Sequence, residues 1–152
     1  MKYDGTYQYI ASWGEEIKSR PDMVKDMGRL LDERVPNKSS VLEFISDDAL
    51  ICLMMKQGEI VGFSWVEFSE SVRQDAELSW FATSPTEVSG LDGKNLLDFT
   101  LEKCKQLDVK NIRFNCFDQS WGRIQDKNKL LKRFGYNVTD SKDSGFDVSI
   151  EI

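Results

Sequence analysis

The sequence predicts a single α/β (α+β) domain. Its 152 residues suit one domain and are enough to bury a core without disulfides or a metal. Short apolar or alternating runs, typical of strands, are interspersed with segments whose apolar residues recur at helical spacing. No internal repeat, low-complexity tract or linker divides the chain. We therefore expect residues 1–152 to form one domain.

The first quarter of the chain predicts a strand followed by helix. Residues 7–13 (YQYIASW) fit a strand, and residues 14–34 are helical in character. Pro21 fits the first turn of a helix, so a short helix before it would be separate, and Pro36 follows where helices end. The apolar run 41–45 leaves its own type open. The residues that recur at helical spacing and would face the core are Met23, Val24, Met27, Leu30 and Leu31.

The middle of the chain predicts a β-hairpin. Residues 49–55 (ALICLMM) are continuously apolar, as a strand covered on both faces would be. Residues 56–59 (KQGE) predict a turn, and residues 60–68 (IVGFSWVEF) predict the partner strand. This hairpin is the local structure that the sequence supports best.

A strand, a loop and a helix follow the hairpin. Residues 76–83 (AELSWFAT) predict a strand that lies after a polar connection and is stopped by Pro85. Residues 86–93 predict a loop containing two glycines, and residues 94–107 predict a helix. The apolar stripe of that helix consists of Leu97, Leu101 and Cys104.

The C-terminal third predicts a strand, a helix and two further strands. Residues 111–117 alternate apolar and polar side chains, which indicates a strand. Residues 123–134 predict a helix that ends at Gly135, a natural left-handed cap. Residues 136–139 and 146–152 can pair as a terminal hairpin.

The composition limits the classes of partner and the kinds of catalytic group that the protein can use. The formal net charge is −6, which favours a cationic partner over nucleic acid, although a negative surface also simply keeps a protein soluble. The chain has no histidine, and this excludes serine–histidine and cysteine–histidine catalysis and histidine-ligated metal sites. Proton transfer would have to use a carboxylate, a tyrosine, a cysteine, a lysine or water.

The three cysteines, Cys52, Cys104 and Cys116, lie in apolar surroundings. Their odd number and wide spacing argue against a disulfide framework or a zinc site, and core packing is the expected role. A nucleophilic role for Cys116 is the alternative. The start of the chain does not resemble a signal peptide, and no run approaches 18 apolar residues. We expect a cytoplasmic protein that does not enter a membrane.

Residues 76–97 (AELSWFATSPTEVSGLDGKNLL) resemble the central motif of the GNAT superfamily of N-acetyltransferases. When Pro85 is placed on the family proline, Gly93 falls on the last loop glycine. Leu96 and Leu97 then fall on the two apolar positions that open the following helix. Residues 134–136 (FGY) are similar to the Leu-Gly-Phe that follows the family's last helix. The resemblance implies a mixed, mostly antiparallel central sheet with one layer of helices on each side.

The resemblance also implies a divergent acetyl-CoA-dependent N-acetyltransferase acting on an amine, either a protein lysine or a small amine. Acetyl-CoA would lie between strands 76–83 and 111–117. Glu77 would be the general base, because in the histone-acetyltransferase branch a glutamate lies early on this strand. The alternative for Glu77 is an outward-facing residue paired with lysine or arginine. The backbone near Phe81, Ala82 and Thr83 would polarise the thioester carbonyl, and Gly90, Asp92, Gly93 and Lys94 would hold phosphates.

Several residues depart from the family pattern. Val88 and Leu91 occupy the positions of an arginine or glutamine and of a glycine, and Asp92 adds a negative charge nearby. Leu131 and Ile124 occupy the positions of the family's general-acid tyrosine and of an asparagine. A second interpretation is therefore a catalytically inactive GNAT-fold domain that binds or inhibits a protein partner, or pairs with itself. A third is the transfer of a different acyl group.

The aromatic residues have two interpretations, packing in the core and contact with a ligand or partner. Tyr136, at the family's phenylalanine position, is expected in the core, like most of the cluster Phe63, Trp65, Phe68, Trp80 and Phe81. Some of that cluster could line a substrate groove. Trp121 lies in a predicted loop, where exposure would indicate a ligand or partner surface.

Overall fold

A seven-stranded sheet runs through the computed structural model, which describes residues 7–34, 37–69, 74–114, 129, 131–139 and 148–152. The strand order is β1-β2-β3-β4-β5-β7-β6. All neighbouring strands are antiparallel except β4 and β5, which are parallel. The strands are β1 (Gln8–Trp13), β2 (Leu50–Lys56), β3 (Glu59–Phe68), β4 (Asp75–Thr83), β5 (Asn111–Phe114), β6 (Asn137–Thr139) and β7 (Val148–Glu151).

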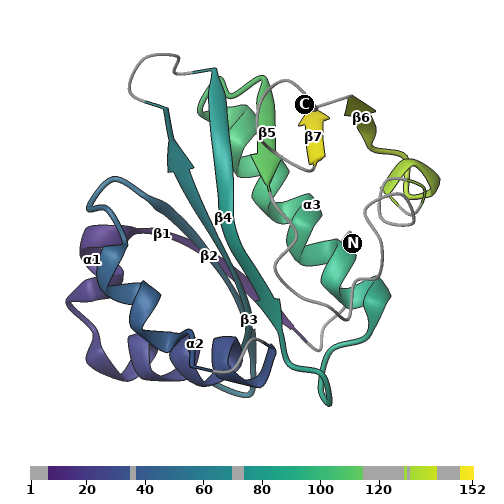
Figure 1. Ribbon diagram of the computed structural model, residues 1–152. Coiled ribbons are helices and arrows are strands. Elements are labelled where there is room, and N and C mark those ends of the chain that lie inside the picture. The colour runs from purple at the N-terminus through teal and green to yellow at the C-terminus, as the bar shows by residue number, and fades with distance from the viewer. Residues whose placement is uncertain (1–6, 35–36, 70–73, 115–128, 130, 140–147) are drawn as a thin grey trace.

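Helices cover both faces of this sheet (Figure 1). On one face lie α1 (Gly14–Lys18) and α2 (Pro21–Arg34), and on the other lies α3 (Gly90–Gln106). Each face has its own core: Met27 and Phe63 belong to the first, and Leu96 and Ile112 to the second. The α/β class and the mixed, mostly antiparallel sheet with flanking helices are thus confirmed.

The predictions for the first half of the chain are confirmed in type and nearly in bounds. Pro21 begins α2, separately from α1, and Met27, Leu30 and Leu31 are buried. Gln57 and Gly58 form the β2–β3 turn, with φ values of 52° and 81°. Positive φ values at both central residues are typical of a two-residue hairpin turn, and glycine adopts them readily. The run 41–45, left open above, belongs to the 3₁₀ helix η1 (Ser39–Phe44) and the residue after it.

The predicted start of α3 is wrong. The helix begins at Gly90, not at Lys94, so part of the predicted loop 86–93 is helical. Ser89 is the N-cap, and its side chain accepts a hydrogen bond from the Asp92 N–H. The Gly93 N–H bonds to the Ser89 carbonyl at 2.9 Å. The cap stabilises a first turn that contains two poor helix formers.

The terminal strands pair as predicted: β6 is antiparallel to β7, which is antiparallel to β5. Gly135 has a φ of 96°, as expected of a left-handed cap after the helical residues 131–133. The rest of the predicted helix 123–134, residues 115–117 of the predicted strand, Cys116, Trp121 and Ile124 lie outside the described residues. No helix in the described part of the chain is long and apolar enough to cross a membrane.

Cys52 and Cys104 are core residues, as predicted. Both side chains are fully buried. Burial raises the pKa of the Cys52 thiol to about 11 and that of the Cys104 thiol to about 12. Both thiols therefore stay neutral at physiological pH, and a neutral thiol is a poor nucleophile.

Candidate active site

Strands β4 and β5 are parallel neighbours in the sheet. In the described residues their ladder consists of three residue pairs, from Asp75–Asn111 to Glu77–Arg113. Strand β4 continues beyond Glu77 to Thr83 alongside β3, whereas the described part of β5 ends at Phe114. Glu77 therefore lies at the end of the described β4–β5 ladder.

A β-bulge follows shortly after Glu77 in β4. Trp65 of β3 pairs with Trp80, but the next residue, Val66, pairs with Leu78, so Ser79 is an extra residue in β4. Bulges bend a strand, increase its twist and change the direction of nearby side chains. Leu78 packs in the core beneath α3, whereas Trp80 packs against the core beneath α2.

The predicted site residues after the bulge lie on both faces of the sheet. Phe81 packs against the core beneath α3, and Ala82 is buried in the core beneath α2. Thr83 lies near α3, because its Cγ2 is 4.0 Å from where a Cβ on Gly93 would be. The end of β4 is thus close to the first turn of α3.

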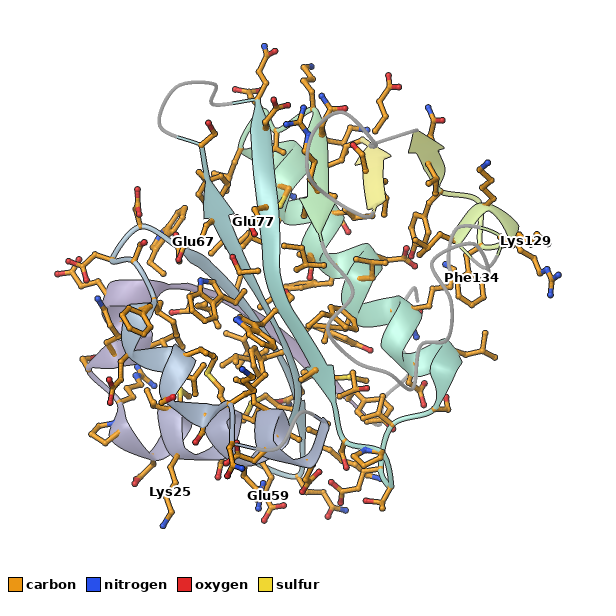
Figure 2. All side chains as sticks on the ribbon, viewed as in Figure 1. Lys25, Glu59, Glu67, Glu77, Lys129 and Phe134 are labelled. Carbon is orange, nitrogen blue, oxygen red and sulfur yellow. The ribbon has the colours of Figure 1, made fainter. Side chains whose placement is uncertain are left out.

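Glu77 lies directly opposite Glu67 of β3 (Figure 2). The Oε1 atom of Glu67 accepts hydrogen bonds from the Trp65 indole at 2.6 Å and from the Ser46 backbone N–H at 3.2 Å. Partial burial, and then the charge of Glu67, raise the pKa of Glu77 above its ordinary value. A carboxylate with a raised pKa binds protons more strongly and is a better general base.

Arg113 is the ladder partner of Glu77 on β5. Its guanidinium pairs with Asp75 instead, with Nη2 3.3 Å from Oδ2. Asn111 also donates to Asp75, at 3.1 Å. Among the described residues, it is therefore Asp75, and not Glu77, that pairs with Arg113.

The N-terminus of α3 carries its own carboxylate. The Ser89 hydroxyl lies 2.9 Å from Oδ2 of Asp92, and the Asp92 N–H donates back to Ser89 Oγ at 3.2 Å. The Tyr7 hydroxyl, 2.7 Å from the Glu87 carbonyl, is 3.4 Å from the same Asp92 oxygen. An anion arriving at this helix end would meet the negative charge of Asp92.

Gly90 and Gly93, in the first turn of α3, are not required by packing. A Cβ added at Gly90 would meet no described atom within 4 Å, and one at Gly93 would meet only Thr83 Cγ2, at 4.0 Å. Leu91 between them is 70% exposed. Val88 instead packs against the core beneath α3. The backbone at both glycines is therefore open to close approach by a ligand.

Lys94 is engaged within the protein. Its ammonium lies 2.8 Å from the Asp98 carboxylate and 5.5 Å from the centre of the Tyr136 ring. Tyr136 donates its hydroxyl hydrogen to the same Asp98. Burial and this hydrogen bond raise the pKa of Tyr136 far above that of an ordinary tyrosine. Tyr136 is half-buried, and its hydroxyl links the start of β6 to α3.

Two carboxylates of this region, Glu67 and Asp98, escaped the sequence analysis. Glu67 follows a long apolar run near the end of β3, and a carboxylate in such a place in the sequence is a signal that could have been used. Asp98 lies four residues after Lys94 on α3, a spacing typical of helical ion pairs. Leu131, at the family's tyrosine position, is a core residue with 2% exposure.

No family model matches the sequence, and no curated protein matches it. Solved structures do match the fold. An acyl-CoA N-acyltransferase from Pseudomonas aeruginosa aligns with a TM-score of 0.71 at 9% identity, over 95% of this chain and 98% of that one. A GNAT-family protein from Desulfovibrio desulfuricans gives 0.69 at 12% identity, over 96% and 98%. PaiA N-acetyltransferase from Thermoplasma acidophilum, in complex with coenzyme A, gives 0.63 at 14% identity, over 96% and 99%. The chain therefore has the GNAT fold.

Proposed function

We propose that this protein is an acetyl-CoA-dependent N-acetyltransferase whose acceptor is an amine. The observation that carries the proposal is the place of Glu77 in the sheet, where it ends the described β4–β5 ladder, lies opposite Glu67 and shortly precedes a bulge in β4. The similar structures include proteins named for acyl-CoA and coenzyme A, which agrees with this substrate class.

The described residues fit acetyl-CoA in part. The backbone at Gly90 and Gly93 is open, and the N-terminus of a helix favours phosphate. Asp92 opposes an anion at this end, and Lys94 is already paired with Asp98. The N–H groups of Asp92 and Gly93 already donate to Ser89. We therefore expect the phosphates to be held by the backbone N–H groups of residues 90 and 91 rather than by the lysine, with an affinity that Asp92 reduces.

Glu77 acts as the general base. It accepts a proton from the acceptor ammonium, directly or through one water, and leaves a neutral amine. The amine nitrogen forms a bond to the acetyl carbon as the carbon–sulfur bond breaks, and the departing thiolate takes the nitrogen's second proton. The products are an N-acetyl amide and free coenzyme A. Backbone N–H groups near residues 81–83 would stabilise the oxygen that becomes negative.

The charge of the protein favours a cationic acceptor. The formal net charge is −6, and Glu67 and Glu77 lie opposite each other on β3 and β4. Opposite charges raise the encounter rate and the local concentration of such a substrate. Among the similar structures is an aminoglycoside 6′-acetyltransferase, with a TM-score of 0.69 at 14% identity, and aminoglycosides are polyamines.

The test is a release assay for the coenzyme A thiol with a panel of amines and lysine peptides. We expect turnover with at least one amine, and we expect Glu77→Gln to lower kcat/KM by about 10²–10⁴. Glu59→Gln, a change of the same charge at the far end of β3, is the matched control and should leave turnover unchanged. Equal turnover in Glu77→Gln and wild type would remove Glu77 from the mechanism.

The second candidate is a catalytically inactive protein-binding domain, and the N-terminus of α3 favours it. Asp92 places a negative charge where the phosphates of coenzyme A would have to bind. Leu91 beside it is an apolar residue with 70% of its surface exposed. A binder of this kind would give no heat with acetyl-CoA at millimolar concentration. It would also tolerate Glu77→Gln without loss of partner binding.

A further inference from the structure

We propose that Glu67 is a positioning residue for catalysis, whose fixed negative charge opposite Glu77 makes Glu77 a stronger base toward the acceptor ammonium. The effect of Glu67 on catalysis rests on the proposed acetyl transfer. Its effect on the proton affinity of Glu77 concerns only these two side chains. Glu67 need not touch the substrate. It acts through Glu77.

The geometry places the two carboxylates together. Glu67 and Glu77 are paired residues in the antiparallel β3–β4 ladder, so their side chains leave the same face of the sheet. Directly opposite residues in such ladders have Cβ atoms about 4.5–5.5 Å apart, and like charges there repel. Figure 2 shows the two side chains next to each other on their adjacent strands. Repulsion at this distance favours protonation of one of them.

The hydrogen bonds distinguish the two carboxylates. Oε1 of Glu67 accepts from the Trp65 indole at 2.6 Å and from the Ser46 N–H at 3.2 Å. Donors of this kind stabilise the ionised form of a carboxylate. No hydrogen bond to the Glu77 side chain is among those that join the described residues. Glu67 is therefore held in place by two donors, and Glu77 is the carboxylate whose pKa is raised.

The other charged groups near Glu77 do not cancel this effect. On β5, Arg113 faces Glu77 in the ladder, but its guanidinium pairs with Asp75 of β4. On the segment beside Ser46, Asp47 is paired with Lys18. Burial and the charge of Glu67 act in the same direction, and both raise the pKa of Glu77. Glu67 is the part of this environment that a single isosteric substitution can remove.

The substitution is Glu67→Gln. The glutamine oxygen can still accept from the Trp65 indole and the Ser46 N–H, so the change removes the charge and keeps the hydrogen bonds. Glu59→Gln is the matched control, because it removes the same charge from the same strand. Residue 59 is exposed and lies eight residues away, which is about 26 Å along a strand (Figure 2).

The first measurement is an NMR titration of the protein labelled with ¹³C at glutamate carboxyl carbons. The Glu77 signal is identified by its loss in Glu77→Gln. In Glu67→Gln we expect its midpoint to fall by about half a pH unit or more, since a like charge within about 4–6 Å has been removed. In Glu59→Gln it should stay where it is in the wild type. Glu67→Met, which removes the charge and fills a similar space, should give the same fall.

The second measurement is the pH dependence of kcat/KM for acetyl transfer. We expect the acidic limb to move to lower pH in Glu67→Gln by the same amount as the NMR midpoint, with a several-fold lower plateau. A residue that only supports the fold would lower activity without moving that limb. A Glu77 midpoint that is unchanged in both Glu67 variants would overturn the inference, whatever the activity. If the Glu77 midpoint falls in Glu67→Gln but the wild-type protein transfers no acetyl group to any amine, the inference stands and the proposed function is overturned.

Discussion

Ser89 and Asp92 hydrogen-bond to each other in both directions at the N-terminus of α3. The Asp92 N–H donates to Ser89 Oγ at 3.2 Å, and the Ser89 hydroxyl lies 2.9 Å from Asp92 Oδ2. This arrangement resembles a capping box with aspartate in place of glutamate. It stabilises the helix start, and it also places a negative charge where the proposed phosphates would bind.

Replacing Asp92 by Asn should therefore tighten the binding of coenzyme A. Asparagine keeps an oxygen for the Ser89 hydroxyl and removes the charge. A charge at a helix N-terminus is worth about 0.3–1 kcal/mol, so we expect the dissociation constant to fall about two- to fivefold. Calorimetry with coenzyme A at low salt measures this change.

Glu102→Gln is the control for Asp92→Asn. It removes one charge from the same helix, ten residues further along, which is about 15 Å away. It should leave the affinity unchanged. Equal affinities in wild type and Asp92→Asn would mean that coenzyme A does not approach this end of α3.

Gly90→Ala should separate binding from stability. No described atom lies within 4 Å of an added Cβ, and alanine favours helix, so the melting temperature should stay equal or rise slightly. If the ligand approaches the backbone there, the methyl group should weaken coenzyme A binding several-fold. Thermal unfolding and calorimetry on the same sample measure both effects. A variant that binds as tightly as wild type would contradict this placement.

Gly14→Ala provides the opposite case and tests the packing of the fold. An added Cβ at residue 14 would lie 1.9 Å from the Ser46 carbonyl oxygen and 2.7 Å from Ile45 Cγ2. The backbone would have to move, because neither contact can be relieved by a side-chain rotation of the new alanine. We expect a loss of about 1–3 kcal/mol or more in the free energy of unfolding. Urea unfolding measures it, and unchanged stability would contradict the contact.

Glu77 should cost stability at neutral pH. Its pKa is higher in the folded protein than in the unfolded chain, so the folded state binds more protons between the two values. Stability from this group is therefore present below the unfolded pKa of about 4.3 and is lost as the pH rises through the folded value. Glu77→Gln should raise the melting temperature at pH 7–8, and its advantage should vanish below about pH 4. A destabilised variant at pH 8 would contradict the repulsion between Glu67 and Glu77.

Tyr136→Phe should weaken the link between α3 and the C-terminal strands. It removes the hydroxyl that donates to Asp98 and leaves that carboxylate to Lys94. We expect a loss of about 1–2 kcal/mol in the free energy of unfolding. In the folded wild-type protein, the absorbance at 295 nm should show Tyr136 still protonated at pH 11, since its pKa is strongly raised. A phenol that ionises near pH 10, as in model peptides, would contradict the contact.

The elements that the sequence predicted well are those with a strong local signal. The β2–β3 hairpin follows from an unbroken apolar run, Gln57-Gly58 and a second apolar run, and α2 follows from Pro21 and helical spacing. The start of α3 was misplaced because Gly90, Asp92 and Gly93 are all poor helix formers. The signal that could have located it is Ser89 three residues before Asp92, a capping pattern.

The site was only partly readable from the sequence. Glu77 stood out because of its place in a motif, and the structure places it opposite Glu67 at the end of the described β4–β5 ladder. Its partner Glu67 could not be found by spacing, because the pattern of a single strand does not give its register with the neighbouring strand. Register and bulges are set by packing between distant segments, which no local pattern records.

The binding of acetyl-CoA itself is the most direct test of the account. Titration calorimetry of the wild-type protein should give a one-to-one complex with a micromolar dissociation constant, weakened by Gly90→Ala and tightened by Asp92→Asn. Absence of heat at millimolar acetyl-CoA, with the protein folded by circular dichroism, would contradict the account and leave a GNAT fold put to another use.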